Sequence, residues 1–336
     1  MESIKKESSI YKQILKQYIE TQDETSLYSA EQISKSFIKN SLLPEEIVNL
    51  HIQALMELYP DLSADFQHSM DFLLETMISY GLAHQQFQSL QERQSKLESE
   101  IAVAANMQNS LLATKKPQVE GLDIGVISVP ASQMNGDYHH FIQGSDGSVG
   151  IALADVIGKG IPAALCMSMI KYSMESFPEE SMSPKAILKN LNRVVEQNID
   201  PSMFITMFYA QYTPAEKKLH YASAGHEPGY YFNSHDHTFH TMEAKGVVLG
   251  VSSTAEYAQH TLELQKGDMA ILLTDGVTES RRGDDFIETE EVLEVIQQYA
   301  HLSAQEMVMK VYKYFERVQN FELKDDFSLI VLKRDV

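Results

Sequence analysis

The sequence contains no tryptophan and only one cysteine, Cys166, among its 336 residues. A single cysteine excludes an intramolecular disulfide and any zinc site built from several cysteines, and it suits a reducing compartment. Because Ala163, Ala164 and Met167 lie close to it in sequence, we interpret Cys166 as a buried thiol rather than a reactive one.

Positive charge and long apolar runs are also scarce. The chain has 27 Lys and Arg against 47 Asp and Glu, a formal net charge of −20. Nucleic-acid binding requires clustered basic residues, so this balance favours basic partners or metal cations instead. No apolar run approaches the ~18 residues of a membrane span, and no signal-peptide core follows the first residues. We therefore expect a cytoplasmic protein that binds neither nucleic acid nor a membrane.

Glycine and proline are nearly absent from the first 112 residues, where only Pro44, Pro60 and Gly81 occur. Apolar residues recur there at helical spacing, which predicts four amphipathic helices. The third helix would begin near Pro44, because proline is tolerated in the first turn. We expect residues 1–84 to form a small helical bundle that binds partners. Such a bundle is small enough to need a second copy, so we expect a homodimer.

The fourth helix is expected to continue through residues 85–119 as a linker. A repeat with steps of three and four residues runs along it, at Phe87, Leu90, Gln94, Leu97, Ile101, Ala104, Gln108 and Leu111. This spacing is typical of a coiled-coil seam, and the two glutamines and the alanine would weaken it. The alternative is a single, solvent-exposed linker helix. A coiled coil with such a weak seam can switch between the paired helices and the single exposed helix.

Beyond residue 120 the pattern changes to the alternation expected of β-strands. Strands are predicted at 122–129, 137–142, 148–155, 204–212, 219–225, 228–233, 269–276 and 327–334. Paired helical patterns at 161–177 and 184–198, and again at 288–299 and 303–319, interrupt the strands. Strands in runs with paired helices predict an α+β domain over residues 120–336, with sheets packed on each other and the helices outside.

Aspartates stand where several of these apolar runs begin or stop: Asp137, Asp155, Asp275 and the pair Asp325 and Asp326. Taken singly, an aspartate at a strand end is usually a turn residue bonded to nearby backbone. Together they would repel, because two carboxylates 4 Å apart cost on the order of 4 kcal/mol at an effective dielectric of about 20. A divalent cation would remove that cost.

An all-oxygen ligand set favours Mg²⁺ or Mn²⁺ over zinc. Histidine does not change this conclusion, because His235, His237 and His240 are better explained as part of a polar hairpin than as metal ligands.

The segment after Asp155 is rich in glycine, with Gly158 and Gly160 flanking Lys159. Glycines permit a close approach of the backbone to a ligand, and the main-chain carbonyl of Val156 is a candidate metal ligand. Lys159 either attracts an anionic substrate or is a solvated loop residue.

Five motifs in order carry a family resemblance: GDY at 136–138, DVIGKGIPAAL at 155–165, ASAGHEPG at 222–229, TDGVTE at 274–279 and DDFSLIVL at 325–332. Over residues 120–334 the chain resembles the catalytic domain of metal-dependent serine/threonine phosphatases of the PPM type, in the bacterial SpoIIE-like branch. The helical domain and linker are similar to those of phosphatases that activate the general stress sigma factor in bacilli.

This resemblance implies an αββα sandwich with two Mn²⁺ or Mg²⁺ ions at one edge. By motif, Asp155 would bridge both ions and Val156 would contribute its carbonyl. Asp275 and Asp325 would hold one ion and Asp137 the other. Asp326 would support the site, because the family often has asparagine there. The arginine that binds phosphate in eukaryotic relatives has no counterpart here.

The resemblance also implies a substrate and a regulator. The substrate would be a phosphorylated STAS-domain anti-anti-sigma factor, and an activator similar to the switch protein RsbT would bind the N-terminal domain. His226, in AGHEP, is either an acid or orienting group or a structural turn residue. Two other functions compete: a non-catalytic signalling adaptor that keeps the fold, and a metal-dependent phosphodiesterase or nuclease, which the acidic charge disfavours.

Overall fold

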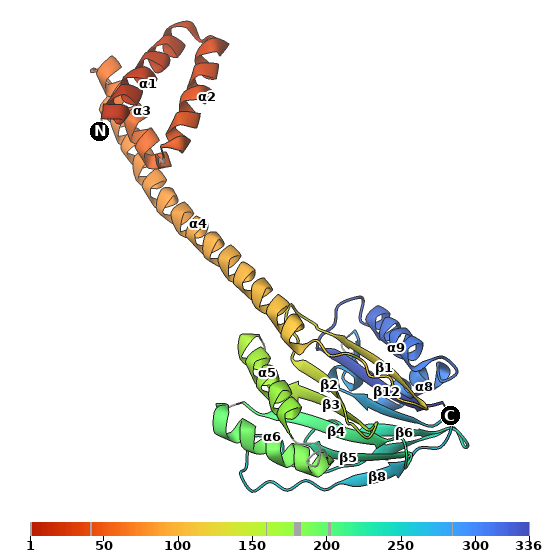
Figure 1. The fold of residues 1–336 in the computed structure, drawn as a ribbon. Coiled ribbons are helices and arrows are strands. Elements are labelled where there is room, and N and C mark those ends of the chain that lie inside the picture. The colour runs from red at the N-terminus through yellow and green to blue at the C-terminus, as the bar shows by residue number, and fades with distance from the viewer. Residues whose placement is uncertain are drawn as a thin grey trace. The chain divides into compact units, whose positions relative to one another are not determined.

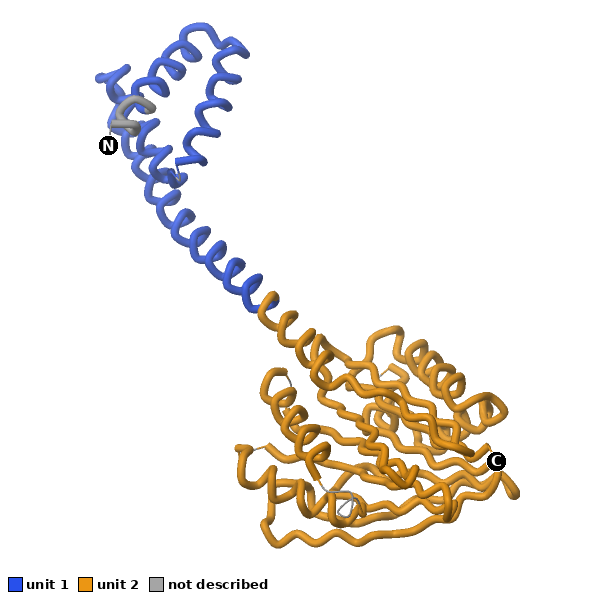
Figure 2. The backbone as a smooth tube through the Cα atoms, viewed as in Figure 1, with its two compact units in different colours: residues 1–98 blue, residues 99–336 orange. Residues whose placement is uncertain are grey.

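The computed structural model describes residues 2–40, 42–158, 160–177, 183–200, 203–283 and 285–335. Lys159 therefore lies outside the described residues. The chain divides into two compact units, residues 1–98 and 99–336 (Figure 2). We call them the helical unit and, after the resemblance that its sequence carries, the catalytic unit, and describe each by itself.

Among the described residues up to 112 there are four helices, as predicted: α1 (Glu2–Thr21), α2 (Glu24–Lys39), α3 (Pro44–Leu58) and α4 (Ala64–Leu112). The last of them ends at Leu112, before the end of the linker helix expected at residue 119. Asp23 begins α2 by accepting a hydrogen bond from the backbone N–H of Ser26 (2.6 Å), which satisfies one of the unpaired donors of the first turn. Pro44 occupies the start of α3. Within the described part of the chain, no helix is long and apolar enough to cross a membrane.

The core of the helical unit is small. Ile33, Phe37 and Leu50 are buried, and partly buried residues such as Tyr11 and Ile14 surround them. Many large apolar side chains of this unit remain exposed instead. A bundle with so few buried residues gains little hydrophobic free energy from its own fold.

The catalytic unit is built on two five-stranded antiparallel sheets (Figure 1). The first sheet has the order β1-β12-β9-β6-β7, with bounds Leu122–Val129, Phe327–Arg334, Met269–Leu273, Gly229–Asn233 and Thr238–Met242. The second has the order β2-β3-β4-β5-β8, with bounds Asp137–Gln143, Val149–Val156, Ile205–Thr213, Lys218–Ala224 and His260–Glu263.

Helices cover the outer face of each sheet. The second sheet packs against α5 (Ile161–Ser176) and α6 (Pro184–Asn198), and the first against α8 (Thr289–Gln298) and α9 (Ala304–Val318) (Figure 1). A third buried cluster, including Phe208 and Ile330, fills the space between the sheets. The unit is therefore an αββα sandwich, which confirms the predicted fold. Cys166 is buried in α5, and burial raises the pKa of its thiol.

The structure contains short elements that the sequence pattern did not predict. These are strands β7 and β8, the hairpin of β10 (Arg281–Arg282) and β11 (Asp285–Phe286), and the short helix α7 (Asp275–Thr278). Strand β7 is mostly exposed, so it lacks the alternation that reveals a half-buried strand. The turn between β6 and β7 holds His235 and His237, and His240 lies in β7. The polar hairpin predicted around these histidines is therefore present, although its second strand was not among the predicted strands.

Candidate metal centre

Two of the predicted aspartates face each other across a strand pair. Strand β2 begins at Asp137, and its register partner in β3 is Asp155. The N–H of Val156 donates to the carbonyl oxygen of Gly136 (3.1 Å), so the end of β3 is fixed to the turn that precedes β2. The antiparallel register therefore brings residues 18 positions apart in sequence to one edge of the second sheet.

Asp326 reaches the same place from the first sheet. Its carboxylate accepts hydrogen bonds from the backbone N–H of Ala131 (2.7 Å) and from that of Gly136. A Cβ atom at Gly136 would lie 3.0 Å from Asp326 Oδ2 and 3.7 Å from Asp155 Oδ1. Glycine at this position thus leaves room for two carboxylates, one from each sheet. Both carboxylate oxygens of Asp326 accept hydrogen bonds from backbone N–H groups. This is consistent with the supporting role predicted for it.

Asp137 is the most deeply buried of the five carboxylates, with 4% of its surface exposed. Thr274 donates its hydroxyl proton to Asp137 Oδ2 (2.7 Å). Burial raises the pKa of Asp137 well above its usual value, and the charges of Asp155 and Asp326 add to this shift. The ionised form is costly because it is poorly solvated and surrounded by like charge. A cation bound there would stabilise it.

Asp275 and Asp325 form the other side of the group. Asp275 is the first residue of α7, which directly follows β9 and Thr274. Its pKa is raised, first by burial and then by the charge of Asp325. Asp325 Oδ1 accepts a hydrogen bond from the N–H of Asp326 (3.0 Å). The two acidic segments are thus close enough for their charges to interact.

Gly276 explains how α7 fits so closely against the segment before β12. A Cβ atom at this position would lie 2.0 Å from the carbonyl oxygen of Asp326, a distance that side chains do not adopt. Any side chain there would push α7 away and displace Asp275 from Asp325. The sequence reading placed Gly276 in a motif but gave no physical reason for it.

The structure thus gathers all the predicted aspartates, at the ends of β2, β3, β9 and β12. Among the described residues, however, no three His, Cys, Asp or Glu side chains already converge as a metal-binding group. The donors are carboxylates, the ligands that Mg²⁺ and Mn²⁺ prefer. The pKa values of Asp137 and Asp275 are raised, first by burial and then by the charges of the neighbouring aspartates. The residues present therefore fit a divalent cation chemically. Their individual ligand roles, and that of the Val156 carbonyl, stay predictions.

His226 lies beside this group, in the loop between β5 and β6. Its Nδ1 shares a hydrogen bond with the hydroxyl of Thr206 (2.8 Å), and its Nε2 is buried without a hydrogen-bond partner among the residues that the structure describes. Burial lowers the pKa of His226 to about 4, so the ring is neutral at neutral pH. These contacts favour the structural reading of His226 over a role as a general acid.

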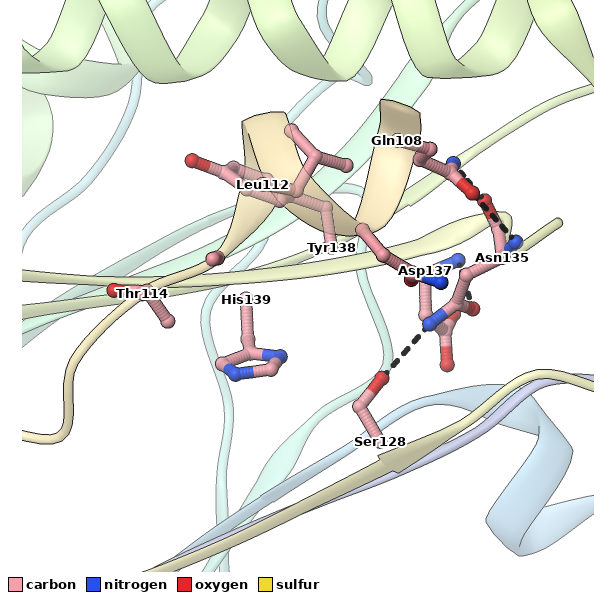
Figure 3. A pocket seen from close by; sticks show the side chains of 10 residues that line it. Gln108, Leu112, Thr114, Ser128, Asn135, Asp137, Tyr138 and His139 are labelled. Carbon is pink, nitrogen blue, oxygen red and sulfur yellow. Dashed lines mark hydrogen bonds between the residues drawn. The ribbon is translucent and has the colours of Figure 1, made fainter. Parts of the chain in front are cut away.

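The last turns of α4 also contact this edge, which the sequence reading missed. Gln108 donates to the carbonyl oxygen of Asn135 (2.7 Å) and accepts from its N–H (3.0 Å). The side chain of Asn135 in turn donates to Ser128 Oγ (2.9 Å). Figure 3 shows these three residues beside Asp137, at a cavity of about 270 Å³.

Gln108 was therefore wrongly assigned to the exposed seam. Only 3% of its surface is exposed, because it caps both polar groups of a backbone turn that leads directly into Asp137. A spacing of three and four residues defines a helix face but cannot tell which partner covers it.

Comparisons with known proteins agree with this architecture. A family model described as stage II sporulation protein E (SpoIIE) matches residues 145–335. Another, described as the N-terminal domain of phosphoserine phosphatase RsbU, matches residues 9–83. Phosphoserine phosphatase RsbU of Bacillus subtilis (strain 168) is 54% identical over 326 residues, 97% of either chain. The chain belongs to the RsbU family of phosphoserine phosphatases.

As an RsbU-family protein, the chain is a phosphoserine phosphatase of the metal-dependent PPM, or PP2C, class. This excludes the alternatives of a non-catalytic adaptor and of a nuclease. It also relates the chain to the regulation of stress responses.

Solved structures support the fold of the catalytic unit. The SiaA-PP2C domain of Pseudomonas aeruginosa has a TM-score of 0.61 at 16% identity, covering 72% of this chain and 99% of that domain. The RsbU and RsbW domains of Rv1364c from Mycobacterium tuberculosis give 0.56 at 22% identity, covering 67% and 62%.

Proposed function

We propose that the chain removes phosphate from a phosphoserine of a STAS-domain anti-anti-sigma protein and thereby promotes the general stress response. The observation that carries this proposal is the position of five aspartates from both sheets along one edge of a PPM sandwich, close enough for their charges to interact. The identity with phosphoserine phosphatase RsbU over 97% of both chains supports the choice of substrate.

Two Mn²⁺ or Mg²⁺ ions are proposed to occupy this edge. Asp155 and the Val156 carbonyl would lie between them, with Asp137 on one ion and Asp275 and Asp325 on the other. Bound there, the ions would lower the pKa of a water molecule and neutralise the charge of the phosphoryl group.

The surrounding residues keep these carboxylates in place. The hydroxyl of Thr274 orients Asp137, and Asp326 holds the turn at residues 131–136 through two backbone N–H groups. Asp155 is fixed by the register of β3 against β2 and β4. These carboxylates then need to move little when the phosphate group binds. Such preorganisation of charged groups lowers the free energy of the transition state.

Regulation is proposed to act through the helical part of the chain. Residues 1–84 would bind an activator similar to RsbT and would pair with a second copy, and residues 85–119 would transmit the signal as a linker. The exposed apolar residues of the helical unit support a surface that a partner covers. We propose that the protein works in the cytoplasm, where such partners are found.

An assay of phosphate release can test the phosphatase activity, the substrate and the activator separately. The full chain with Mn²⁺ is assayed on the phosphorylated STAS protein and on a small aryl phosphate, with and without the RsbT-like activator. We expect hydrolysis of both substrates, loss of both with a chelator, and faster hydrolysis of the STAS protein with the activator. If only the aryl phosphate is hydrolysed under all conditions, the proposed substrate is wrong while the phosphatase activity stands.

A further inference from the structure

Electrostatics poses a problem for a phosphatase with a formal net charge of −20. A phosphoprotein substrate carries extra negative charge, and proteins of like charge repel each other on approach. The following inference rests on the proposed action on phosphoproteins. Some surface of the chain must then offset this repulsion.

Helix α9 carries three exposed cations on one face, Lys310, Lys313 and Arg317. Their spacing of three and four residues places them in one row. Together with Tyr299, Tyr314 and Val318 they line a cavity of about 430 Å³. We call this cavity the α9 groove.

The cations of the groove have no carboxylate in direct contact, although the charge of Lys310 contributes to the lowered pKa of Glu306 one turn earlier. Within the described parts of the chain, Lys310, Lys313 and Arg317 form no ion pair, whereas other surface cations such as Lys189 and Lys218 pair with glutamates at 2.6 and 3.3 Å. An unpaired row of cations on an acidic protein retains its attraction for an anionic partner.

The walls of the groove are held in place. Tyr314 donates its hydroxyl proton to Glu291 Oε1 (3.0 Å), and Arg282 donates to the same oxygen (2.6 Å). Glu291 of α8 therefore ties α9 to the β10–β11 hairpin, and Arg282 offsets its charge. In that hairpin Arg281 lies over the ring of Phe286, 4.1 Å from its centre.

The groove lies at the end of α9 that leads to the catalytic edge. Directly after the helix, Gln319 Nε2 donates to Ser280 Oγ (3.2 Å), and Ser280 Oγ donates to the carbonyl oxygen of Gly276 (3.0 Å) in α7. Asp325 follows Arg317 by eight residues. The end of α9 is thus linked to Asp325 along the chain, and to the helix that carries Asp275 through the hydrogen bonds of Gln319 and Ser280.

We propose that the α9 groove docks an acidic segment of the phosphoprotein substrate beside the catalytic edge. The three cations spread over about 10 Å of helix, which suits a stretch of Asp and Glu residues better than one phosphate group. Tyr299, Tyr314 and Val318 provide apolar contacts for the aliphatic parts of the side chains of such a segment. Phosphoserines followed or preceded by acidic residues are then the preferred substrates.

The experiment removes the three positive charges of the α9 groove with substitutions that should not disturb the fold. The triple variant Lys310→Ala, Lys313→Ala and Arg317→Ala removes three exposed side chains and keeps a good helix former at each position. The matched control, Lys217→Ala, Lys245→Ala and Lys266→Ala, removes three exposed cations elsewhere on the catalytic unit. The probes are two phosphoserine peptides, one with Glu-rich and one with Lys-rich flanks, and a small aryl phosphate, all with the full chain and Mn²⁺.

We expect the triple variant to lose about tenfold in kcat/KM and in binding, measured by fluorescence anisotropy, for the Glu-rich peptide at low salt. The Lys-rich peptide and the aryl phosphate should be unaffected, and salt should reduce the difference. The charge-conserving variant Lys310→Arg, Lys313→Arg and Arg317→Lys should retain the wild-type preference.

Three results would overturn the proposal: no change for the Glu-rich peptide, an equal loss in the control variant, or a change in oligomeric state in place of a change in binding. The last would assign the groove to a second copy of the chain. Failure of the proposed function is distinct, because the wild type would then hydrolyse the Glu-rich peptide but not the phosphorylated STAS protein.

Discussion

The helical and catalytic units bury their apolar residues to very different degrees. The catalytic unit has three extensive clusters, with residues such as Phe208, Phe315 and Phe327 almost completely buried. In the helical unit Ile38 and Phe72 are 76% and 77% exposed. One unit holds a rigid site with its own core, whereas the other presents a surface that a partner can cover. The extensive cores and the exposed apolar surface thus lie in different parts of one chain.

Helix α4 shows the same difference along its length. Its exposed seam residues Phe87, Leu90 and Leu97 retain 57%, 62% and 58% of their surface. Ala105 and Gln108, closer to its end, are buried in the catalytic unit. The helix therefore changes from an open apolar face to a docked polar contact over about five turns.

The largest expected effect is confined to the catalytic unit. Asp155→Asn should reduce phosphatase activity by more than about a hundredfold, because the proposed bridging ligand loses its charge. Thermal unfolding and circular dichroism should be unchanged. Asp146→Asn, in the exposed β2–β3 turn, is the matched control and should remain active. Normal turnover by Asp155→Asn would refute the metal assignment.

For the other carboxylates, the loss of activity on substitution should depend on what each side chain contacts. Asp275→Asn and Asp325→Asn are expected to be severely impaired in steady-state hydrolysis of an aryl phosphate across a Mn²⁺ titration. Asp326→Asn should be milder, because asparagine still offers one acceptor to Ala131 or Gly136. A larger loss for Asp326→Asn than for Asp325→Asn would show that the assignment is wrong by one residue.

The two linker glutamines should behave in opposite ways, although both were first placed in one seam. Gln108→Leu leaves two polar groups of Asn135 without their partner, which should cost about 1–3 kcal/mol of stability and lower activity. Gln94 is exposed, so Gln94→Leu should strengthen a seam with a second copy and raise basal activity without activator.

Activity and melting temperature of each variant would be measured together with those of Gln85→Leu, an exposed glutamine on the opposite side of the repeat. Equal basal activity in Gln94→Leu and Gln85→Leu, despite a tighter coiled coil, would refute the linker as the switch.

The smallest effect concerns association of the helical unit. Residues 1–84, expressed alone, should sediment as a folded dimer at micromolar concentration, because their exposed apolar side chains exceed what one small bundle buries. A charged substitution at the exposed Phe72, such as Phe72→Glu, would test whether this face carries the contact. A stable monomer would contradict the prediction and leave this surface to another partner.

Much of the site was visible in the sequence, because strand ends are marked by where an apolar alternation stops. Asp137, Asp155 and Asp275 could be found in this way. The pairing of Asp137 with Asp155 could not, since register depends on contacts between strands that periodicity does not encode. The roles of Gly276, which lies in a recognised motif, and of Asn135 could not be found either, because each depends on contacts with residues far away in sequence.

The distribution of the acidic group over both sheets has a consequence for how the enzyme folds. Strand β12 pairs with β1 about 200 residues earlier in the chain, as the contact between Ser128 and Ser328 illustrates. Contacts of such long range form slowly. If the β2–β3 hairpin forms before β12 inserts, the partly folded chain holds Asp137 and Asp155 together without Asp325. Recovery of activity on refolding should therefore coincide with the insertion of the last strand, and earlier intermediates should be inactive.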